Sequence, residues 1–454
     1  VVEKEVYGLE AENIMIGWKY PGAGTRDAMI AEIASSILYN GSAGLIDLNV
    51  NQKQTTLGAF GMPYTRPDAG EFILMGNPKA GQTLEEVRDI LIAETEKLRN
   101  GDFDEALLTG TINNLKLNMM NLLENNSGRA DLYVQSFING TDWKDEVAYI
   151  DNMSKVTKAD VVEWAGKYLG NNNCAIVYKR QGEDKSVQKV SAPKITPIKS
   201  NRDAQSDFLA EIQNTEVAPI EPVFVDYDKD MSRFQAEGLD VLYAENKLND
   251  IAFISYAFDA GTETDPALNL AFDYLSYLGT DKMSAEEIAE KMYQLACSFR
   301  LRAGSLSTGI TVSGLSENLE TAMDIVEELV YNAVPDEQIL ANLKSDMLKS
   351  RNDAKLSQSS CFSALQKYVM YGPEYIRKTT LTDEQIKTIT SEELLSKIRD
   401  LVSHRHEVLY YGPATKEEVS ALIKEHHKVA EDLKTLEKKY PVLRKTDANK
   451  VYLA

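Results

Sequence analysis

The strongest constraint on the fold is an internal duplication, because residues 235–430 repeat the order of elements found in residues 1–180. Each half shows paired strands, helices, a strand that ends in glycine, a long helical stretch and a closing strand. The spacing between matching anchors falls only from 239 residues at the first pair to 232 at the last; the pairs are Gly22 and Gly261, Gly76 and Gly314, Leu84 and Leu319, Asp104 and Asp336, Val156 and Ile389, Ile176 and Val408. A solenoid repeat has only ~20–50 residues, so we interpret this pattern as a duplicated domain.

Hydrophobic periodicity gives the fold class of each repeat. Apolar residues alternate from Ile14 to Tyr20, as in a half-buried strand, and capping boxes at Thr83–Glu86 and Ser284–Glu287 each predict the start of a helix. Asp265 and Pro266 predict another helix start. The sequence therefore predicts an α+β protein of two homologous α/β sandwich domains, each a mostly antiparallel sheet covered by helices and joined by a long linker.

Composition shifts divide the chain into four parts. The two predicted domains are residues 1–180 and 235–430. Between them, the composition predicts a Pro-rich linker over residues 181–234, with one short helix near 204–212. The tail after Val419 is predicted to be helical to about Lys439. Residues 431–454 are interpreted as a linker to a missing domain. Because the chain starts at Val1 without Met, we interpret that start as a cut in a longer protein.

Charge excludes some partners. The 454 residues carry a net charge of -21 and 43% of them are hydrophobic, as in an ordinary soluble protein. This charge argues against nucleic acid and anionic membranes, which bind clustered Lys and Arg. No apolar run reaches the ~20 residues of a membrane span. The three cysteines, Cys174, Cys297 and Cys361, form no metal-binding pattern and are expected to be buried thiols.

Several short segments of the second repeat match those of a known enzyme family. They are DAGTETD at 259–265, LGT at 278–280, MSAEEIA at 283–289 and GLSENL at 314–319. In this, the second repeat resembles the pitrilysin/insulinase family of zinc metallopeptidases, which carry an inverted HxxEH motif. The first repeat resembles the companion domain of that family, which shares the fold without the motif. The resemblance implies two insulinase-like domains.

The zinc ligands of that family have no counterpart here. Counting back from Gly279, the two histidines fall on Leu270 and Tyr274, and the general base falls on Asp273. The third ligand of the family falls near Lys349-Ser350-Arg351, where no carboxylate stands. A catalytic zinc needs about three protein ligands. The sequence therefore predicts a degenerate site with no catalytic, cofactor-binding or metal-ligating residues in this chain, and the resemblance places zinc in a missing N-terminal domain of the parent protein.

All four histidines lie far along the chain from the degenerate motif. His404 and His406 flank Arg405 at the start of a strand, and His426 and His427 are adjacent in a helical stretch. We interpret them as a chance HxH and a solvated helix face. The alternative is a metal site formed by these histidines.

Domain order suggests where such a chain belongs. A motif-free domain, a linker and a degenerate motif domain match the second and third domains of the large four-domain members of this family. We therefore expect a non-catalytic segment of a zinc metallopeptidase that helps to form a closed chamber around unfolded peptides. The alternative is a stand-alone inactive partner or scaffold subunit, and a weaker one is an enzyme with a new active site between the repeats. An HxxEH sequence upstream of Val1 would separate the first two.

Each of these hypotheses predicts specific binding partners for the chain. The expected partners are the catalytic half of the same polypeptide or a homologous active subunit, peptide substrates, and a second copy of the chain in a homodimer. We expect neither nucleic acid nor a membrane span. The resemblance places the protein in a bacterial periplasm or cell envelope rather than in the cytoplasm.

Overall fold

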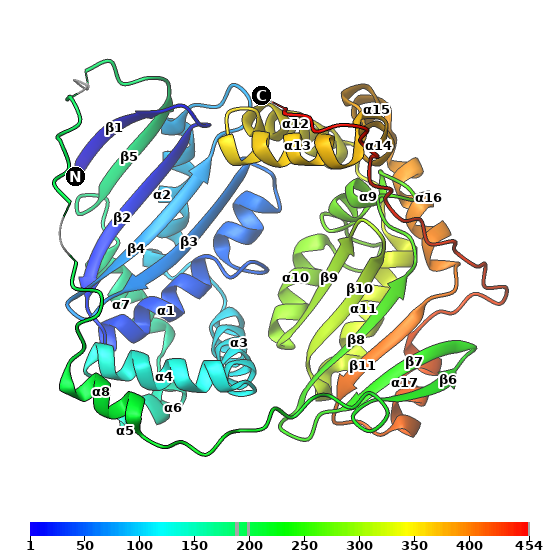
Figure 1. Cartoon of the computed structure of the whole chain (residues 1–454), viewed down its shortest axis with the longest axis horizontal. Coiled ribbons are helices and arrows are strands. Elements are labelled where there is room, and N and C mark those ends of the chain that lie inside the picture. The colour runs from blue at the N-terminus through cyan, green and yellow to red at the C-terminus, as the bar shows by residue number, and fades with distance from the viewer. Residues whose placement is uncertain (187–189, 198–199, 453–454) are drawn as a thin grey trace.

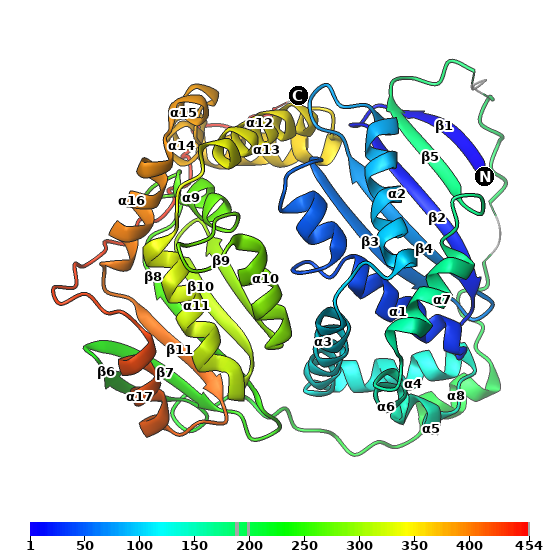
Figure 2. The same ribbon diagram turned by 180° about the vertical axis from the view of Figure 1, so that it is seen from behind.

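Two β-sheets, each with helices on one face only, form the protein (Figure 1). The structure is a computed structural model that describes residues 1–186, 190–197 and 200–452. In the view from behind, the helices lie in front of both sheets (Figure 2). The predicted α+β class, with two helix-covered and mostly antiparallel sheets, is confirmed.

The first sheet has five strands in the order β1-β5-β2-β4-β3. Only β1 and β5 pair in parallel, and all other neighbours are antiparallel. Its strands are β1 Val2–Gly8, β2 Asn13–Pro21, β3 Gly58–Thr65, β4 Ala69–Asn77 and β5 Ala175–Gln181. Its helices are α1 Arg26–Leu38, the π-helical turn η1 Asp47–Asn51, α2 Leu84–Asn100, α3 Glu105–Leu123, α4 Asn126–Asn139, α5 Trp143–Val147, α6 Tyr149–Met153 and α7 Lys158–Tyr168.

The second sheet has six strands in the order β6-β7-β11-β8-β10-β9. Its strands are β6 Ser232–Ala236, β7 Leu239–Glu245, β8 Ile251–Phe258, β9 Cys297–Ala303, β10 Thr308–Leu315 and β11 Glu407–Gly412. Its helices are α9 Leu268–Leu275, α10 Ala285–Gln294, the 3-10 turn η2 Ser316–Asn318, α11 Leu319–Asn332, α12 Glu337–Ala354, α13 Gln358–Tyr371, α14 Pro373–Thr379, α15 Asp383–Thr388, α16 Ser391–Val402 and α17 Lys416–His426.

The strand orders show the duplication directly. Without β6, the second sheet repeats the first strand for strand, including the single parallel pair. The structure shows why two of the anchor positions are glycine. A Cβ on Gly22 would lie 2.2 Å from the Pro67 carbonyl oxygen, and a Cβ on Gly261 would lie 2.4 Å from the Gly304 carbonyl oxygen. Both glycines let the chain pass close to the turn of the following hairpin.

Helix capping accounts for the other matching positions. Asp104 caps the N-terminus of α3, and Asp336 caps that of α12 at the same point of the second repeat. The predicted capping boxes at Thr83 and Ser284 open α2 and α10. Local sequence therefore fixes where the main helices begin in both repeats.

The structure corrects three details. The helix expected from Asp265-Pro266 begins only at Leu268, because the Asp265 carboxylate accepts the Ala267 N–H in a turn before it. The tail helix ends at His426 and not near Lys439. Of the three cysteines expected to be buried, Cys361 is exposed. The helix expected near 204–212 is found as α8, Asp207–Asn214.

Each repeat has its own hydrophobic core, and mainly polar groups join the two. The α3 helix packs on α10, where Asn114 donates from Nδ2 to the Tyr293 carbonyl oxygen at 2.8 Å. A salt bridge of 2.9 Å joins Lys79 to Asp346 of α12. An interface of this polar kind allows one domain to move against the other. No described helix is both long and apolar enough to cross a membrane.

Candidate functional site

The α9 helix carries the three positions that the resemblance matches to the HxxEH motif, and two of them point into the core. Leu270 is 1% exposed and Tyr274 is completely buried, both within the apolar cluster of the second repeat. Asp273 lies on the exposed side of the helix, where it accepts a hydrogen bond of 3.0 Å from the Asn269 amide. Only the position of the general base therefore reaches the surface.

The Tyr274 hydroxyl holds helix ends together. It accepts the N–H of Asp336 at 2.8 Å and lies 3.1 Å from the Asp336 carbonyl oxygen. It also lies 3.0 Å from the Ser391 hydroxyl at the start of α16. A buried hydroxyl with these partners has no capacity left for another ligand.

The side chains at the position expected for the third ligand are also engaged in contacts with other residues. On α12, Lys349 forms a salt bridge with Asp353, and Arg351 contacts Asp383 and the Leu381 carbonyl oxygen. Across the part of the chain that the structure describes, no group of three His, Cys, Asp or Glu side chains is placed to hold a metal. Leucine offers no ligand atom and Tyr274 is fully bonded, so these residues do not fit a catalytic zinc.

A cavity of about 420 Å³ lies between the two repeats beside the exposed side of α9. This volume falls in the ~300–1,000 Å³ range of ligand pockets. Its walls come from α9, α10 and β9 of the second repeat, and from the segment between α1 and β3 of the first; they include Tyr39, Asp47, Asn51, Gln52, Phe272, Asp273, Tyr277, Ile288, Met292, Phe299 and Leu301. Gln52 closes one side by donating to the Tyr277 carbonyl oxygen at 3.1 Å.

Several acidic groups around this cavity have raised pKa values. Protein atoms around the Asp273 carboxyl raise its pKa through desolvation. Desolvation also raises the pKa of the Tyr277 hydroxyl, and the nearby carboxylates of Asp273 and Asp346 raise it further. Burial raises the pKa of Asp47 too, although the N–H groups of Asn40 and Gly44 stabilise its carboxylate. The cavity therefore offers carboxyl groups but no pair of nucleophile and base.

The β9 strand borders the cavity with an unpaired edge. Within the described residues β9 forms a ladder with β10 alone, so the other side of β9 is the margin of the sheet. At the two ends of this hairpin, Gly304 donates to Ser307 and Leu315 donates to Ala296. Because hydrogen-bonded pairs alternate along an antiparallel ladder, the even-numbered residues of β9 bond to β10. The N–H and C=O groups of Phe299 and Leu301 therefore point away from the sheet.

The equivalent edge in the first repeat is blocked. The β3 strand is the margin of its sheet, and it corresponds to β9 in the duplication (Figure 1). The Asn51 side chain accepts the Ala59 N–H at 2.9 Å and donates to the Ala59 carbonyl oxygen at 2.8 Å. Further along the same edge, Pro63 has no N–H to donate. Strand addition is therefore prevented at β3 and left open at β9.

Two of the four histidines, His406 and His427, form a buried cluster that the sequence did not reveal. The Nε2 atoms of His406 and His427 lie 2.8 Å apart, and His427 Nδ1 lies 2.6 Å from the Glu327 carboxylate of α11. His406 directs Nδ1 to the His404 carbonyl oxygen, so its Nε2 accepts from His427. The prediction of a solvated helix face is wrong for His427, which is buried because the chain leaves α17 there and turns inward.

Stacking and hydrogen bonds already engage both imidazole rings of this cluster. The Tyr256 ring stacks on His427 with ring centres 3.8 Å apart, and burial lowers the pKa of His406 to about 4. Each imidazole nitrogen already has a protein partner. The signal that sequence reasoning missed is Glu327, an acid on the apolar side of α11.

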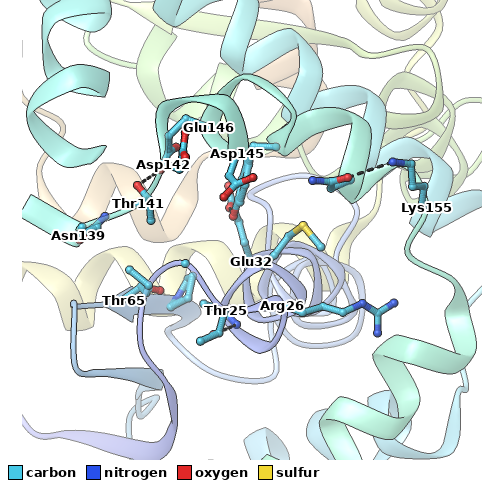
Figure 3. A pocket seen from close by; sticks show the side chains of 18 residues that line it. Thr25, Arg26, Glu32, Thr65, Asn139, Thr141, Asp142, Asp145, Glu146 and Lys155 are labelled. Atoms are coloured by element: carbon cyan, nitrogen blue, oxygen red, sulfur yellow. Dashed lines mark hydrogen bonds between the residues drawn. The ribbon is translucent and has the colours of Figure 1, made fainter. Parts of the chain in front are cut away.

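A larger pocket of about 1210 Å³ lies within the first repeat (Figure 3). Acidic and polar side chains line it, including Thr25, Arg26, Glu32, Thr65, Asn139, Thr141, Asp142, Asp145, Glu146 and Lys155. Burial raises the pKa of Glu32, whose carboxylate accepts the Tyr149 hydroxyl at 2.7 Å. The Glu146 carboxylate bonds to the Thr141 hydroxyl. The pocket is thus a polar hollow in which the carboxylates of Glu32 and Glu146 each accept from a neighbouring hydroxyl group.

Comparisons with known proteins found likenesses in structure alone. No model of a known protein family matches the chain, and no curated protein does. Among solved structures, the periplasmic protease PqqL from Escherichia coli is 14% identical with a TM-score of 0.41, and 98% of this chain covers 52% of that one. A mutant of the ferredoxin protease FusC, in complex with Arabidopsis ferredoxin, is 10% identical with a TM-score of 0.45, and 97% of this chain covers 53% of that one.

A third solved structure matches over a shorter stretch. A protease from Helicobacter pylori is 20% identical with a TM-score of 0.38, and 39% of this chain covers 44% of that one. The chain thus spans about half the length of each of these structures.

Proposed function

We propose that this chain binds extended peptides between its two repeats, by adding them as a strand to the free edge of β9, and that it does not cleave them. The observation that carries the proposal is this edge itself, whose main-chain groups at Phe299 and Leu301 face away from β10. The edge borders the cavity beside α9. Strand addition recognises the main chain of a peptide and therefore tolerates many sequences.

The energetics suit a binding site that releases its ligand. Phe299 and Leu301 together offer two donors and two acceptors, and each hydrogen bond contributes roughly 0.5–1.5 kcal/mol net. The apolar side chains of Phe299, Leu301 and Met292 in the cavity wall add burial of about 25 cal/mol per Å². Ordering the peptide opposes these gains. We therefore expect affinities in the micromolar range or weaker.

The chemistry of the same site supports binding without cleavage. Leu270 and Tyr274 lie in the core, and Asp273 is the sole member of the degenerate motif at the surface. A lone carboxyl group without a zinc-bound water lacks the nucleophile that peptide hydrolysis needs. In the parent protein that we propose, cleavage belongs to a zinc-bearing half, and this chain helps to enclose the substrate.

Peptide binding and peptide cleavage are tested together. A fluorescent peptide of about ten residues, rich in β-branched residues, is titrated with the chain, and its anisotropy is measured. An identical peptide with N-methyl groups on every central amide is the control, because neither of its edges has an N–H left to donate to β9. We expect saturable binding of the first peptide, weak binding of the second, and intact peptide by mass spectrometry after incubation with zinc. Equal binding of both peptides would contradict strand addition, and cleavage would contradict an inactive site.

A second candidate function is that of a partner subunit, and one surface favours it. The α4 helix exposes large apolar side chains on one side, with Phe137 88%, Tyr133 59% and Val134 51% exposed. Its counterpart in the second repeat, α13, exposes Phe362 to 66%. Exposed apolar patches of this kind mark surfaces that other proteins cover. The proposed partners are a catalytic subunit, the other half of a longer chain, or a second copy.

Sedimentation analysis separates these partners from each other. The chain is measured alone, and then Phe137→Ser and Tyr133→Ser are introduced together. A dimer that dissociates in the double variant would support self-association through α4. A monomer at all concentrations would remove the homodimer and leave the other partners.

A further inference from the structure

Two arginines stand on the open face of the free strand. Arg300 and Arg302 are exposed, and they alternate with the half-buried Phe299 and Leu301, which pack toward the helices. Neither guanidinium forms an ion pair with any described residue. Their neighbours on β10 are Thr311 and Gly309, which carry no charge. The edge strand thus presents two positive charges, two residues apart, which no described residue neutralises.

The ladder determines how these arginines meet an incoming peptide. The even-numbered residues of β9 exchange their main-chain hydrogen bonds with β10, so they exchange none with a strand added on the other side. In an antiparallel pair, residues opposite each other without exchanged bonds have Cα atoms only ~4.5 Å apart and side chains closer together. The residues of a bound peptide that lie opposite Arg300 and Arg302 are therefore in direct contact with them.

We propose that this edge selects peptides that carry Asp or Glu at two alternating positions, i and i+2. The inference rests on strand addition at β9, and it names the peptides that the site prefers. Opposite charges that face each other across a ladder attract, and like charges repel. Because side chains alternate between the faces of a strand, only acids two residues apart place both carboxylates opposite Arg300 and Arg302.

The net charge of the chain does not prevent this selection. The whole molecule carries -21, which repels acidic peptides at long range. At physiological salt the Debye length is only ~8 Å, so charges further away are largely screened. Direct contacts with the two guanidiniums are screened less, and arginine pairs with carboxylates through two parallel hydrogen bonds.

The selection is tested with four peptides of one length and one neutral background. One carries Glu at i and i+2, the second carries Glu at i and i+1, the third carries Gln at i and i+2, and the fourth carries Lys there. We expect the first to bind about fivefold more tightly than the third, with the second between them and the Lys peptide the weakest. Raising the salt from 50 mM to 500 mM is expected to remove most of the difference.

Charge reversal supplies the matched variants. The double variant Arg300→Glu and Arg302→Glu is expected to invert the order, so that the Lys peptide binds most tightly. Arg233→Glu is the control, because Arg233 is exposed on β6, at the opposite edge of the same sheet. Circular dichroism shows whether each variant is folded, and the milder pair Arg300→Gln and Arg302→Gln is expected to abolish the preference without inverting it.

The outcomes separate this inference from the function on which it rests. Equal affinities for all four peptides, unchanged by charge reversal, would overturn the acidic preference. If N-methylation still abolished binding in that case, strand addition would stand. If the N-methylated peptide bound as well as its parent, both proposals would fail. An inverted order in the Glu variants, with Arg233→Glu behaving as the unaltered chain, would establish the inference.

Discussion

The two repeats have the same strand order, yet their corresponding edge strands have opposite properties. At β3, the Asn51 amide occupies the main-chain groups of Ala59, and Pro63 removes a donor. At β9, the corresponding groups of Phe299 and Leu301 are left to the cavity. A few side chains thus decide whether a sheet can accept another strand, while the fold itself is unchanged. In the peptide binding that we propose, the edge strand of each repeat therefore decides whether a peptide can be added.

The ionisable groups of the two repeats differ in the same way. The second repeat buries His406 against His427 and Tyr256, and all four histidines of the chain lie in it. In the first repeat, desolvation raises the pKa of the Glu32 carboxyl. Protonation of His406 and protonation of Glu32 therefore change stability with opposite signs.

Closing the β9 edge should give the largest effect. Leu301→Pro removes an outward-pointing N–H from β9, as Pro63 does at β3. An edge strand tolerates proline at such a position, because that N–H takes no part in the sheet. We expect no measurable peptide binding by anisotropy. Leu301→Ala is the matched control, since it loses the same apolar packing but keeps the amide. If Leu301→Pro bound peptides as well as Leu301→Ala, the difference between the two edges would have no functional meaning.

Acid should destabilise the second repeat through His406. Burial and the neighbouring His427 together lower the pKa of His406 to about 4, although the bond to the His404 carbonyl acts in the opposite direction. The unfolded chain has the ordinary pKa of ~6.5. Between pH 6.5 and pH 4, His406 is protonated in the unfolded chain but neutral in the folded one. The free energy of unfolding therefore decreases by about 3 kcal/mol as the pH falls from 6.5 to 4.

Hydrogen exchange at pH 7 and pH 5 tests this difference between the repeats. Protection of β8 and β11 should decrease relative to β2, because the raised pKa of Glu32 makes protonation favour the folded first repeat. His406→Gln should remove the dependence, and His404→Gln should leave it. A pH response that survives His406→Gln would place its origin elsewhere.

Opening the β3 edge should have a smaller effect. Asn51→Ala combined with Pro63→Val frees the main chain of Ala59 and restores a donor. Loss of the two amide hydrogen bonds is expected to cost about 2 kcal/mol in urea denaturation. Calorimetry should then show two peptide sites per chain instead of one. Asn269→Ala, which loses only an exposed contact with Asp273, is the control; a stoichiometry of one would show that β3 is closed by other means.

The smallest effect concerns the contact between the repeats. Lys79 and Asp346 have side chains 22% and 16% exposed. A double-mutant cycle with alanine at both positions is expected to give a coupling of about 1 kcal/mol, because water still reaches both side chains and screens the pair. A coupling of several kcal/mol would show that the salt bridge locks the repeats together.

Much of the fold could be predicted from the sequence because its signals are local. Capping boxes, the alternation in β2 and the paired glycines each depend on neighbouring residues, and they placed α2, α10 and the hairpins correctly. The end of α17 was missed. Residues 427–439 have helical composition, but His427 leaves the helix to reach Glu327, and Lys434 pairs with His404. Long-range contacts override local propensity there.

The candidate site was less predictable than the fold. Counting residues located Leu270, Asp273 and Tyr274 on one helix, and the structure places that helix beside a cavity. The sequence could not show that the Asn51 side chain bonds to Ala59, or that the free edge of β9 lies across the cavity from this loop. Both depend on how the loop between α1 and β3 folds. The His406 cluster joins residues from three distant segments, so no spacing rule would find it.

The connection between the repeats has a consequence for how a ligand can enter. Residues 182–231 separate the last strand of the first sheet from the first strand of the second. Fifty residues can span up to ~165 Å when fully extended, far more than the separation of neighbouring domains. The tether therefore sets no limit on opening, yet it keeps the effective concentration of one repeat around the other near the millimolar range. In the peptide binding that we propose, the two repeats close on a peptide within one chain. They therefore stay together when the peptide leaves, and they can bind another.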